Sequence, residues 1–175
     1  MMTPKKILII GGCVLVIGAI GGMLNPKLAP QPKTQKQEAI QVGVKAGIGD
    51  TESRWEKDYG NLAGQDMIKN VTINGSHVTA VFADDKALNI TIEKRDKYYK
   101  NSAIDDMLPS DRTEIEKVKD KSDPAVIKDL ITYHSDILEK AIPDTRGNFT
   151  VIDASDGLTQ AYINTVIDCT PEFKQ

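Results

Sequence analysis

The sequence predicts an α+β protein in which an N-terminal transmembrane helix precedes one domain with helices packed on an antiparallel sheet. Three observations lead to this fold class. An uncharged apolar run extends from Ile7 to Leu24, two later stretches carry residues that start and stop helices, and several segments alternate apolar and polar residues between turn sequences. A period of two is typical of strands with one buried face, whereas a spacing of three to four residues indicates a helix.

The chain divides into residues 1–24, 25–38 and 39–175. The apolar run of the first part follows Lys5 and Lys6, and it is about as long as the shortest segment that crosses a membrane. We expect a retained signal-anchor. Two alternatives stay open: a cleaved signal peptide that ends at Ala19-Ile20-Gly21, and a lipid attached at Cys13.

Lysines lie on both sides of the apolar run, so their distribution barely favours one orientation. A short N-terminal tail before a long domain usually leaves the domain outside, and we expect a single-pass protein of the cell membrane with its C-terminal domain outside. Gly18 and Gly22 have the spacing that lets two membrane helices approach closely, although a glycine-rich run also produces this spacing by chance. Three prolines among Gln and Lys in residues 25–38 predict a linker.

The charge of the third part limits its partners. From Ala39 onward the chain has 17 basic and 24 acidic residues, a formal charge of −7. We therefore expect no nucleic-acid partner, because phosphate binding needs a basic surface. Of the two cysteines, Cys13 lies in the apolar run, so Cys169 has no partner in the domain and the fold is not a disulfide scaffold. For an exported domain, this cysteine usage suggests a bacterium that does not rely on extracellular disulfides.

The first predicted elements are a short helix and a strand meander. Asp50 or Thr51 caps a helix that Gly60 ends, and Trp55 and Tyr59, one turn apart, dock it by their rings. Three strands follow, at Val71–Ile73, His77–Phe82 and Ala87–Glu93. They are joined by Asn74-Gly75, a strong hairpin signal, and by the acidic turn Asp84-Asp85.

Further elements are predicted in the second half of the domain. A short helix is predicted from Ser102 to Leu108, before Pro109, whereas the charged stretch from Thr113 to Asp123 gives no clear assignment. Asp123-Pro124 predicts the start of a helix that continues to Ile142. An alternative is a strand from Val126 to Tyr133, followed by a helix that Ser135 caps.

The last predicted element is a second hairpin. It pairs Phe149–Asp153 with Leu158–Asp168 around the turn at Asp156-Gly157. A helix followed by a hairpin therefore occurs twice in the predicted order of elements. No identity between individual residues of the two halves supports a sequence repeat.

Two resemblances accompany these elements. In the first, Gly49-Asp50-Thr51 opens a short helix that contains an aromatic residue, ends in Tyr-Gly and is followed by a meander. This element resembles the repeating unit of β-lactamase-inhibitor-protein-like domains, and the small lipoproteins of outer-membrane assembly are similar in it. The tether with Leu108-Pro109-Ser110-Asp111 and Tyr133-His134-Ser135 looks like uncharacterised anchored or exported proteins of Gram-positive bacteria. The first resemblance covers about a third of the chain, lacks the paired cysteines of the inhibitor, and implies a non-catalytic protein-binding module without an active site.

No group of residues has the spacing of a catalytic or metal site. His77, His134 and Cys169 are too few to form a His or Cys metal site, and Ser135 on a helix would point about 100° away from its neighbour His134. We therefore predict no catalytic residue, no metal ligand and no cofactor. The predicted binding residues are Trp55, Tyr59, Asp84 and Asp85.

The resulting hypothesis is a membrane-tethered extracytoplasmic interaction module that binds a protein or an envelope component. The predicted contact surfaces are the open face of the sheet and the loops around Trp55 and Asp84-Asp85. One alternative is an envelope enzyme that uses Cys169 or His134. Another is a structural component of an envelope or mobile-element machine.

Overall fold

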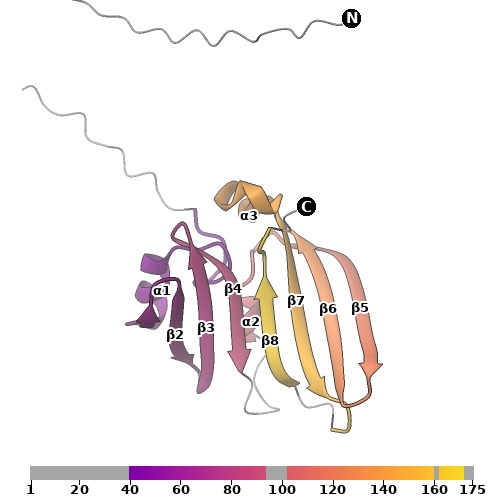
Figure 1. Cartoon of the computed structure of the whole chain (residues 1–175). Helices are drawn as coiled ribbons and strands as arrows, with labels where there is room; N and C mark the ends of the chain where they lie inside the picture. Colours follow the sequence, from indigo (N-terminus) through magenta and orange to yellow (C-terminus); the bar gives the residue numbers. More distant parts are fainter. Residues whose placement is uncertain (1–39, 94–101, 160–161, 172–175) are drawn as a thin grey trace, which may run out of the picture. The chain divides into compact units, whose positions relative to one another are not determined.

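Eight antiparallel strands form one sheet in the described part of the chain (Figure 1). This computed structural model describes residues 40–93, 102–159 and 162–171. The predicted membrane segment, linker, Cys13 and the Gly18/Gly22 pair lie outside these residues. No helix in the described ranges is long and apolar enough to cross a membrane.

The sheet consists of two four-stranded meanders that meet at β4 and β8, in the order β1-β2-β3-β4-β8-β7-β6-β5. The first meander contains β1 (Ala63–Gln65), β2 (Ile68–Ile73), β3 (Ser76–Ala83) and β4 (Lys86–Glu93). The second contains β5 (Thr113–Asp123), β6 (Val126–His134), β7 (Asn148–Asp156) and β8 (Tyr162–Asp168). The predicted antiparallel sheet is therefore confirmed, but strands make up far more of the domain than helices.

The helical elements are short; the first precedes β1, and the others lie between strands. They are α1 (Glu52–Tyr59), α2 (Ser102–Asp105), α3 (Asp136–Ala141) and the 3₁₀ helix η1 (Pro143–Thr145). Of the two predicted caps, Asp50 and Thr51, Thr51 caps α1 by accepting a hydrogen bond at Oγ1 from Arg54 N (3.3 Å). Gly60, at φ 87°, follows the last turn of α1 as predicted.

Two-residue turns set the register of the first meander. Asn74 and Gly75 both have positive φ, at 50° and 83°, as the predicted hairpin requires. Asp84 and Asp85 form the next turn with φ of 49° and 59°, a conformation that aspartate tolerates better than most residues. The predicted meander is thus confirmed.

The predicted helix from Pro124 to Ile142 is wrong, and the alternative of a strand followed by a helix capped by Ser135 is correct. Asp123 Oδ1 accepts from Ala125 N (2.8 Å), so Asp123-Pro124 begins a hairpin turn that joins β5 to β6. An aspartate side chain that bonds a backbone N–H two residues later stabilises a turn by the same interaction that caps a helix. Nine pairs with β7 then hold β6 extended.

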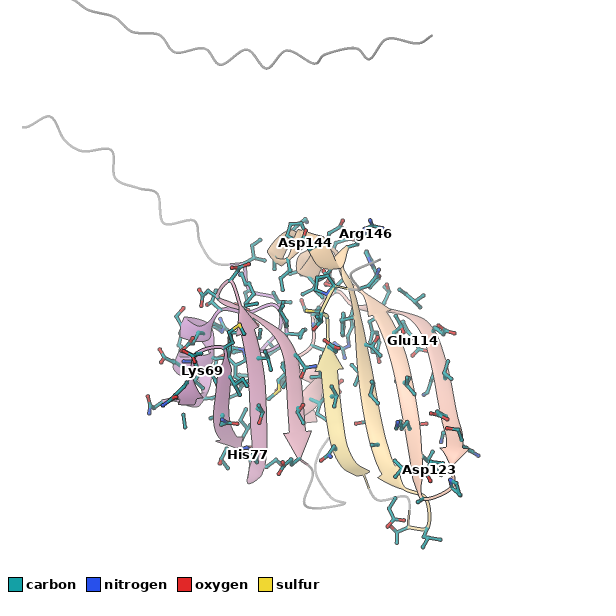
Figure 2. The ribbon with its side chains drawn as sticks, in the orientation of Figure 1. Lys69, His77, Glu114, Asp123, Asp144 and Arg146 are labelled. Carbon is teal, nitrogen blue, oxygen red and sulfur yellow. The ribbon has the colours of Figure 1, made fainter. Side chains whose placement is uncertain are left out.

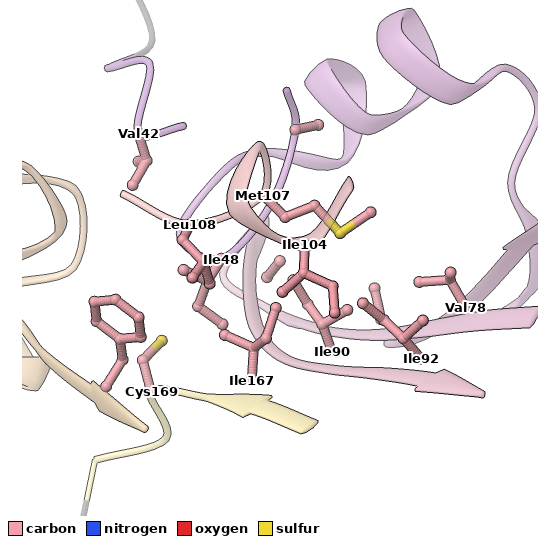
Figure 3. Close-up of a cluster of buried hydrophobic side chains, with 14 of the residues drawn as sticks. Val42, Ile48, Val78, Ile90, Ile92, Ile104, Met107, Leu108, Ile167 and Cys169 are labelled. Carbon is pink, nitrogen blue, oxygen red and sulfur yellow. The ribbon is translucent and has the colours of Figure 1, made fainter. Parts of the chain in front are cut away.

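One face of the sheet, here called the covered face, carries the core. Its buried residues are Val78, Ala80, Phe82, Ile90, Ile92, Val151 and Ile167. α2 lies behind β4 and β8 in Figure 1, and Figure 3 shows the two layers of the core facing each other: Ile48, Met107 and Leu108 against Ile90, Ile92 and Ile167. Fully burying one such side chain contributes about 1.5–3 kcal/mol.

A close backbone approach ties the first residues of the domain to this core. A Cβ on Gly47 would lie 1.8 Å from Met107 O, so only glycine permits the two segments to meet here. Ile48 N donates to Met107 O (3.2 Å) and Gly49 N to Ala87 O (2.8 Å). Residues 42–50 therefore form part of the layer that covers the sheet.

Candidate functional site

The opposite face of the sheet, here called the open face, carries a continuous row of apolar side chains. The register places four residues side by side, one on each strand of the second meander: Val118, Leu130, Ile152 and Val166. We call these four residues the apolar row. Val118 is 44% exposed, and none of the other three is buried. Apolar side chains aligned in this way and left in contact with water are typical of a binding surface.

The same row becomes polar where it crosses the first meander. Val166 is paired with Thr91, Thr91 with Thr79, and Thr79 with Asn70. Thr79 Oγ1 donates to Asn70 Oδ1 (2.8 Å), so these two neighbouring side chains are hydrogen-bonded to each other. After this row we call the open face over β5–β8 its apolar half and the open face over β2–β4 its polar half, although the pair of Ile68 and Val81 places two apolar side chains on the latter.

Two rows composed mainly of polar and charged residues flank the apolar row. One neighbouring row contains Glu116, Thr132, Thr150 and Asp168, and the other contains Asp120, Lys128, Ala154 and Asn164. None of these side chains is buried. An apolar centre within a polar rim is the usual composition of a protein–protein interface.

The strand β5 forms the outer edge of this surface. Within the described ranges it pairs with β6 and with no other strand. Its charges alternate by face: Lys117 and Lys119 lie on the covered-face side, where Lys119 Nζ is 3.2 Å from Asp129 Oδ1, and Glu116 and Asp120 lie on the open face. Figure 2 shows Glu114 on this strand and Asp123 near its end. Such charges oppose edge-to-edge pairing of two identical strands.

The structure places the predicted residue Trp55 inside the core. Its side chain is 0% exposed, its Nε1 donates to Gly47 O (3.1 Å), and its ring packs edge-on against Tyr59 and Phe82 at centroid distances of 5.2 and 5.9 Å. Tyr59 donates its hydroxyl to Ala46 O (2.6 Å). The predicted docking of α1 by its rings is confirmed, and Trp55 has no exposed surface with which to contact a partner.

The other two predicted binding residues, Asp84 and Asp85, are exposed at the turn between β3 and β4. Asp85 Oδ1 accepts a hydrogen bond from Glu52 N (3.1 Å), which links this turn to the start of α1. The turn therefore lies beside the helix that carries Trp55, although Trp55 itself is buried. A binding role for Asp84 and Asp85 stays a prediction.

Neither Cys169 nor Ser135, beside His134, is arranged as a catalytic group. Cys169 is 4% exposed, and burial raises the pKa of its thiol to about 12, so the thiol stays protonated at neutral pH and is a poor nucleophile. Ser135 Oγ donates to Asp111 Oδ1 (2.5 Å) and accepts from Leu138 N (3.0 Å), as the cap of α3. His134 is the half-exposed last residue of β6.

A shallow pocket of about 230 Å³ lies at the start of α1. Its lining consists of Ile40, Gln41, Asp50, Thr51, Ser53, Arg54 and Lys57. Burial raises the pKa of Asp50, and its carboxylate accepts hydrogen bonds from Gly47 N (3.0 Å) and Val42 N (3.3 Å). Asp50 therefore holds residues 42–50 in their fold, and its oxygens are already occupied.

One group of side chains in the described ranges has the ligand types of a metal site. The nearest ligand atoms of His134, Asp136 and Glu139 lie within 4.8 Å of one another. The spacing of His and Cys residues in the sequence does not reveal this group, because two of its three members are carboxylates. The signal that was available is the spacing of Asp136 and Glu139, which places both on one side of a helix next to a histidine.

The apolar row was also not predicted residue by residue, because its members come from four strands whose alignment depends on the register. Comparisons of the chain with models of known families, with curated proteins and with solved structures gave no match.

Proposed function

We propose that this protein is a membrane-tethered extracytoplasmic module that binds a protein or an envelope component through the apolar half of its open face. The observation that carries this proposal is the apolar row of Val118, Leu130, Ile152 and Val166, aligned in register and not buried. The apolar run from Ile7 to Leu24 supports the membrane tether.

The polar rim and the charge of the domain support a protein partner. Interfaces place apolar side chains at the centre and polar ones around them, as the open face does. The formal charge of −7 from Ala39 onward favours a neutral or basic partner surface over an acidic one. The buried Cys169 and the capping role of Ser135 favour a binding role over the catalytic alternative.

The test recovers the partner from cells. A C-terminally tagged full-length chain is expressed in bacterial cells, crosslinked in the intact cells and purified from the membrane fraction, and the co-purified proteins are identified by mass spectrometry. Val118→Lys and Leu130→Lys place a charge in the apolar row, and we expect each to reduce partner recovery at least tenfold. Burying an unpaired charge in an interface costs several kcal/mol, which corresponds to at least this loss.

The matched control is Thr79→Lys, which places the same charge in the same row on the polar half of the open face. It leaves recovery unchanged if the apolar half is the contact surface. Asp84→Lys tests the turn between β3 and β4 separately. Full recovery with Val118→Lys and Leu130→Lys, in variants whose circular dichroism and thermal unfolding match the wild type, would exclude the apolar row.

A further inference from the structure

The end of β6 and the start of α3 bring three metal-ligand types together. His134 is the last residue of β6, and Asp136 and Glu139 lie three residues apart on α3. Residues three apart share one side of a helix. His134 Nε2 is 3.1 Å from Asp136 Oδ1, and the nearest ligand atoms of all three residues lie within 4.8 Å of one another.

The ring of His134 is held from behind in a defined orientation. Gly147, at φ 74°, leaves room for it: a Cβ there would lie 2.8 Å from the ring Cε1 and 3.0 Å from Nδ1. Nδ1 lies 3.4 Å from Asn148 Oδ1. A histidine that binds a metal through one nitrogen usually donates the N–H of the other to an oxygen of this kind, which orients the ring.

This orientation leaves Nε2 facing a carboxylate. When Nδ1–H donates to Asn148, the Nε2 of a neutral imidazole carries a lone pair, and Asp136 presents another lone pair only 3.1 Å away. The same 3.1 Å separation is a hydrogen bond in the tautomer that carries its hydrogen on Nε2, and a metal ion held by both atoms would take the place of that hydrogen.

The spacing and chemistry fit one class of metal. Two ligand atoms of a tetrahedral zinc ion, each about 2.0–2.1 Å from the metal, are about 3.3 Å apart, close to the observed separation of Nε2 and Oδ1. Glu139 is exposed, and its long side chain can turn to close the site. Imidazole with carboxylates suits Zn²⁺ or a neighbouring transition metal, whereas Mg²⁺ and Ca²⁺ prefer oxygen ligands alone.

We propose that His134, Asp136 and Glu139 bind a divalent transition-metal ion such as Zn²⁺, with water completing its coordination. Two carboxylates and a neutral imidazole carry a charge of about −2, which matches the ion. The bound metal joins the end of β6 to α3, whose Leu138 is fully buried close to Gly49 and Val42. The bound metal thus fixes the start of α3 against the end of β6, a role separate from binding through the apolar row.

The test is isothermal titration of ZnCl₂ into the full-length protein in detergent at pH 7.5, with MgCl₂ as the comparison. The protein carries Cys13→Ser and a tag without histidine, so that neither binds the metal. We expect one Zn²⁺ per chain and at least tenfold weaker binding in His134→Ala and in Glu139→Gln. Asn148→Ala weakens binding about tenfold, because the ring loses its orienting partner.

The matched control is His77→Ala, which removes the other histidine of the chain, on β3, and leaves binding unchanged. Glu139→Gln changes an exposed side chain by one charge, so it tests the site without disturbing the fold. Circular dichroism of each variant checks this. The proposal is overturned if the wild type binds no Zn²⁺, or if its affinity is unchanged in both Glu139→Gln and His134→Ala.

Discussion

Strands β3 and β5 belong to the same sheet but differ completely in burial. Every second residue of β3 is buried, from Ser76 through Val78 and Ala80 to Phe82. In β5, ten of the eleven residues are exposed and only Asp120 is half-buried. The first strand lies on a core, whereas the second extends the sheet beyond it.

This difference shows that the first meander contributes mainly to stability, whereas the outer strand of the second contributes mainly accessible surface. The first meander has a covered face that packs on α1, α2 and residues 42–50, so hydrophobic burial holds it. The strand β5 is held by its ladder with β6 and by contacts such as Lys119 to Asp129. Because exposed ion pairs contribute little, β5 adds accessible surface at a small gain in stability.

Replacement of Trp55 should produce the largest effect. Trp55→Ala removes a fully buried ring and its hydrogen bond to Gly47 O, and we expect unfolding free energy to fall by about 3–5 kcal/mol in urea denaturation. Ile115→Ala on β5, where the side chain is 58% exposed, is the control and should change it by less than about 0.5 kcal/mol. Equal losses in the two variants would remove the distinction between the meanders.

A matched pair of Val→Thr substitutions sharpens the same comparison. Both replace a methyl group by a hydroxyl of similar size, Val78→Thr on the covered face of β3 and Val118→Thr on the open face of β5. Val78 is 0% exposed, so its variant should lose about 1–3 kcal/mol, while the variant of the 44% exposed Val118 should lose less than about 0.5 kcal/mol. The midpoints of thermal unfolding give the comparison, and a larger loss at Val118 would contradict it.

The smallest effect is expected at Asp111, and it depends on pH. Desolvation raises the pKa of Asp111, but hydrogen bonds from Ser135 Oγ and Ile137 N outweigh it and leave the pKa below 3.8. A carboxyl group whose pKa is lowered by folding adds stability above its unfolded pKa and loses it as pH falls through the folded value. Asp111→Asn should therefore cost about 1 kcal/mol at pH 7 and progressively less below pH 3.8.

The measurement is urea denaturation of both proteins at pH 7 and at pH 3. Ser135→Ala, which removes the cap of α3, serves as the comparison and should cost about 1 kcal/mol at pH 7. A loss in Asp111→Asn that is the same at both pH values would show that the charge of Asp111 does not stabilise the start of α3.

Most elements of the first meander were predictable because their signals are local. The cap at Thr51, the hairpin turn at Asn74-Gly75 and the alternation in β3 each involve residues that are close in the chain. The helix predicted from Pro124 was wrong because its apolar residues fit a helical spacing equally well. The ladder with β7, which the local sequence does not contain, decides for a strand.

The candidate sites were less predictable than the fold. Asp84 and Asp85 were predicted at an exposed turn and lie there, whereas Trp55 turned out to be a core residue. An aromatic residue one turn from another on a short helix serves either to pack into the core or to contact a partner. Only the layer that packs against the helix distinguishes these two roles. The apolar row depends on the register of four strands, and the group around His134 depends on β6 ending where α3 begins.

The sequence by itself determined the acidic charge of the domain, its turns and the cap of its first helix, because these depend on residue chemistry and on neighbours along the chain. Only the tertiary structure decided which apolar residues are buried. Val78 and Val118 have the same side chain and both lie in strands, but only Val78 meets a second layer. Burial depends on what packs against a residue, and such contacts join segments that are distant in sequence.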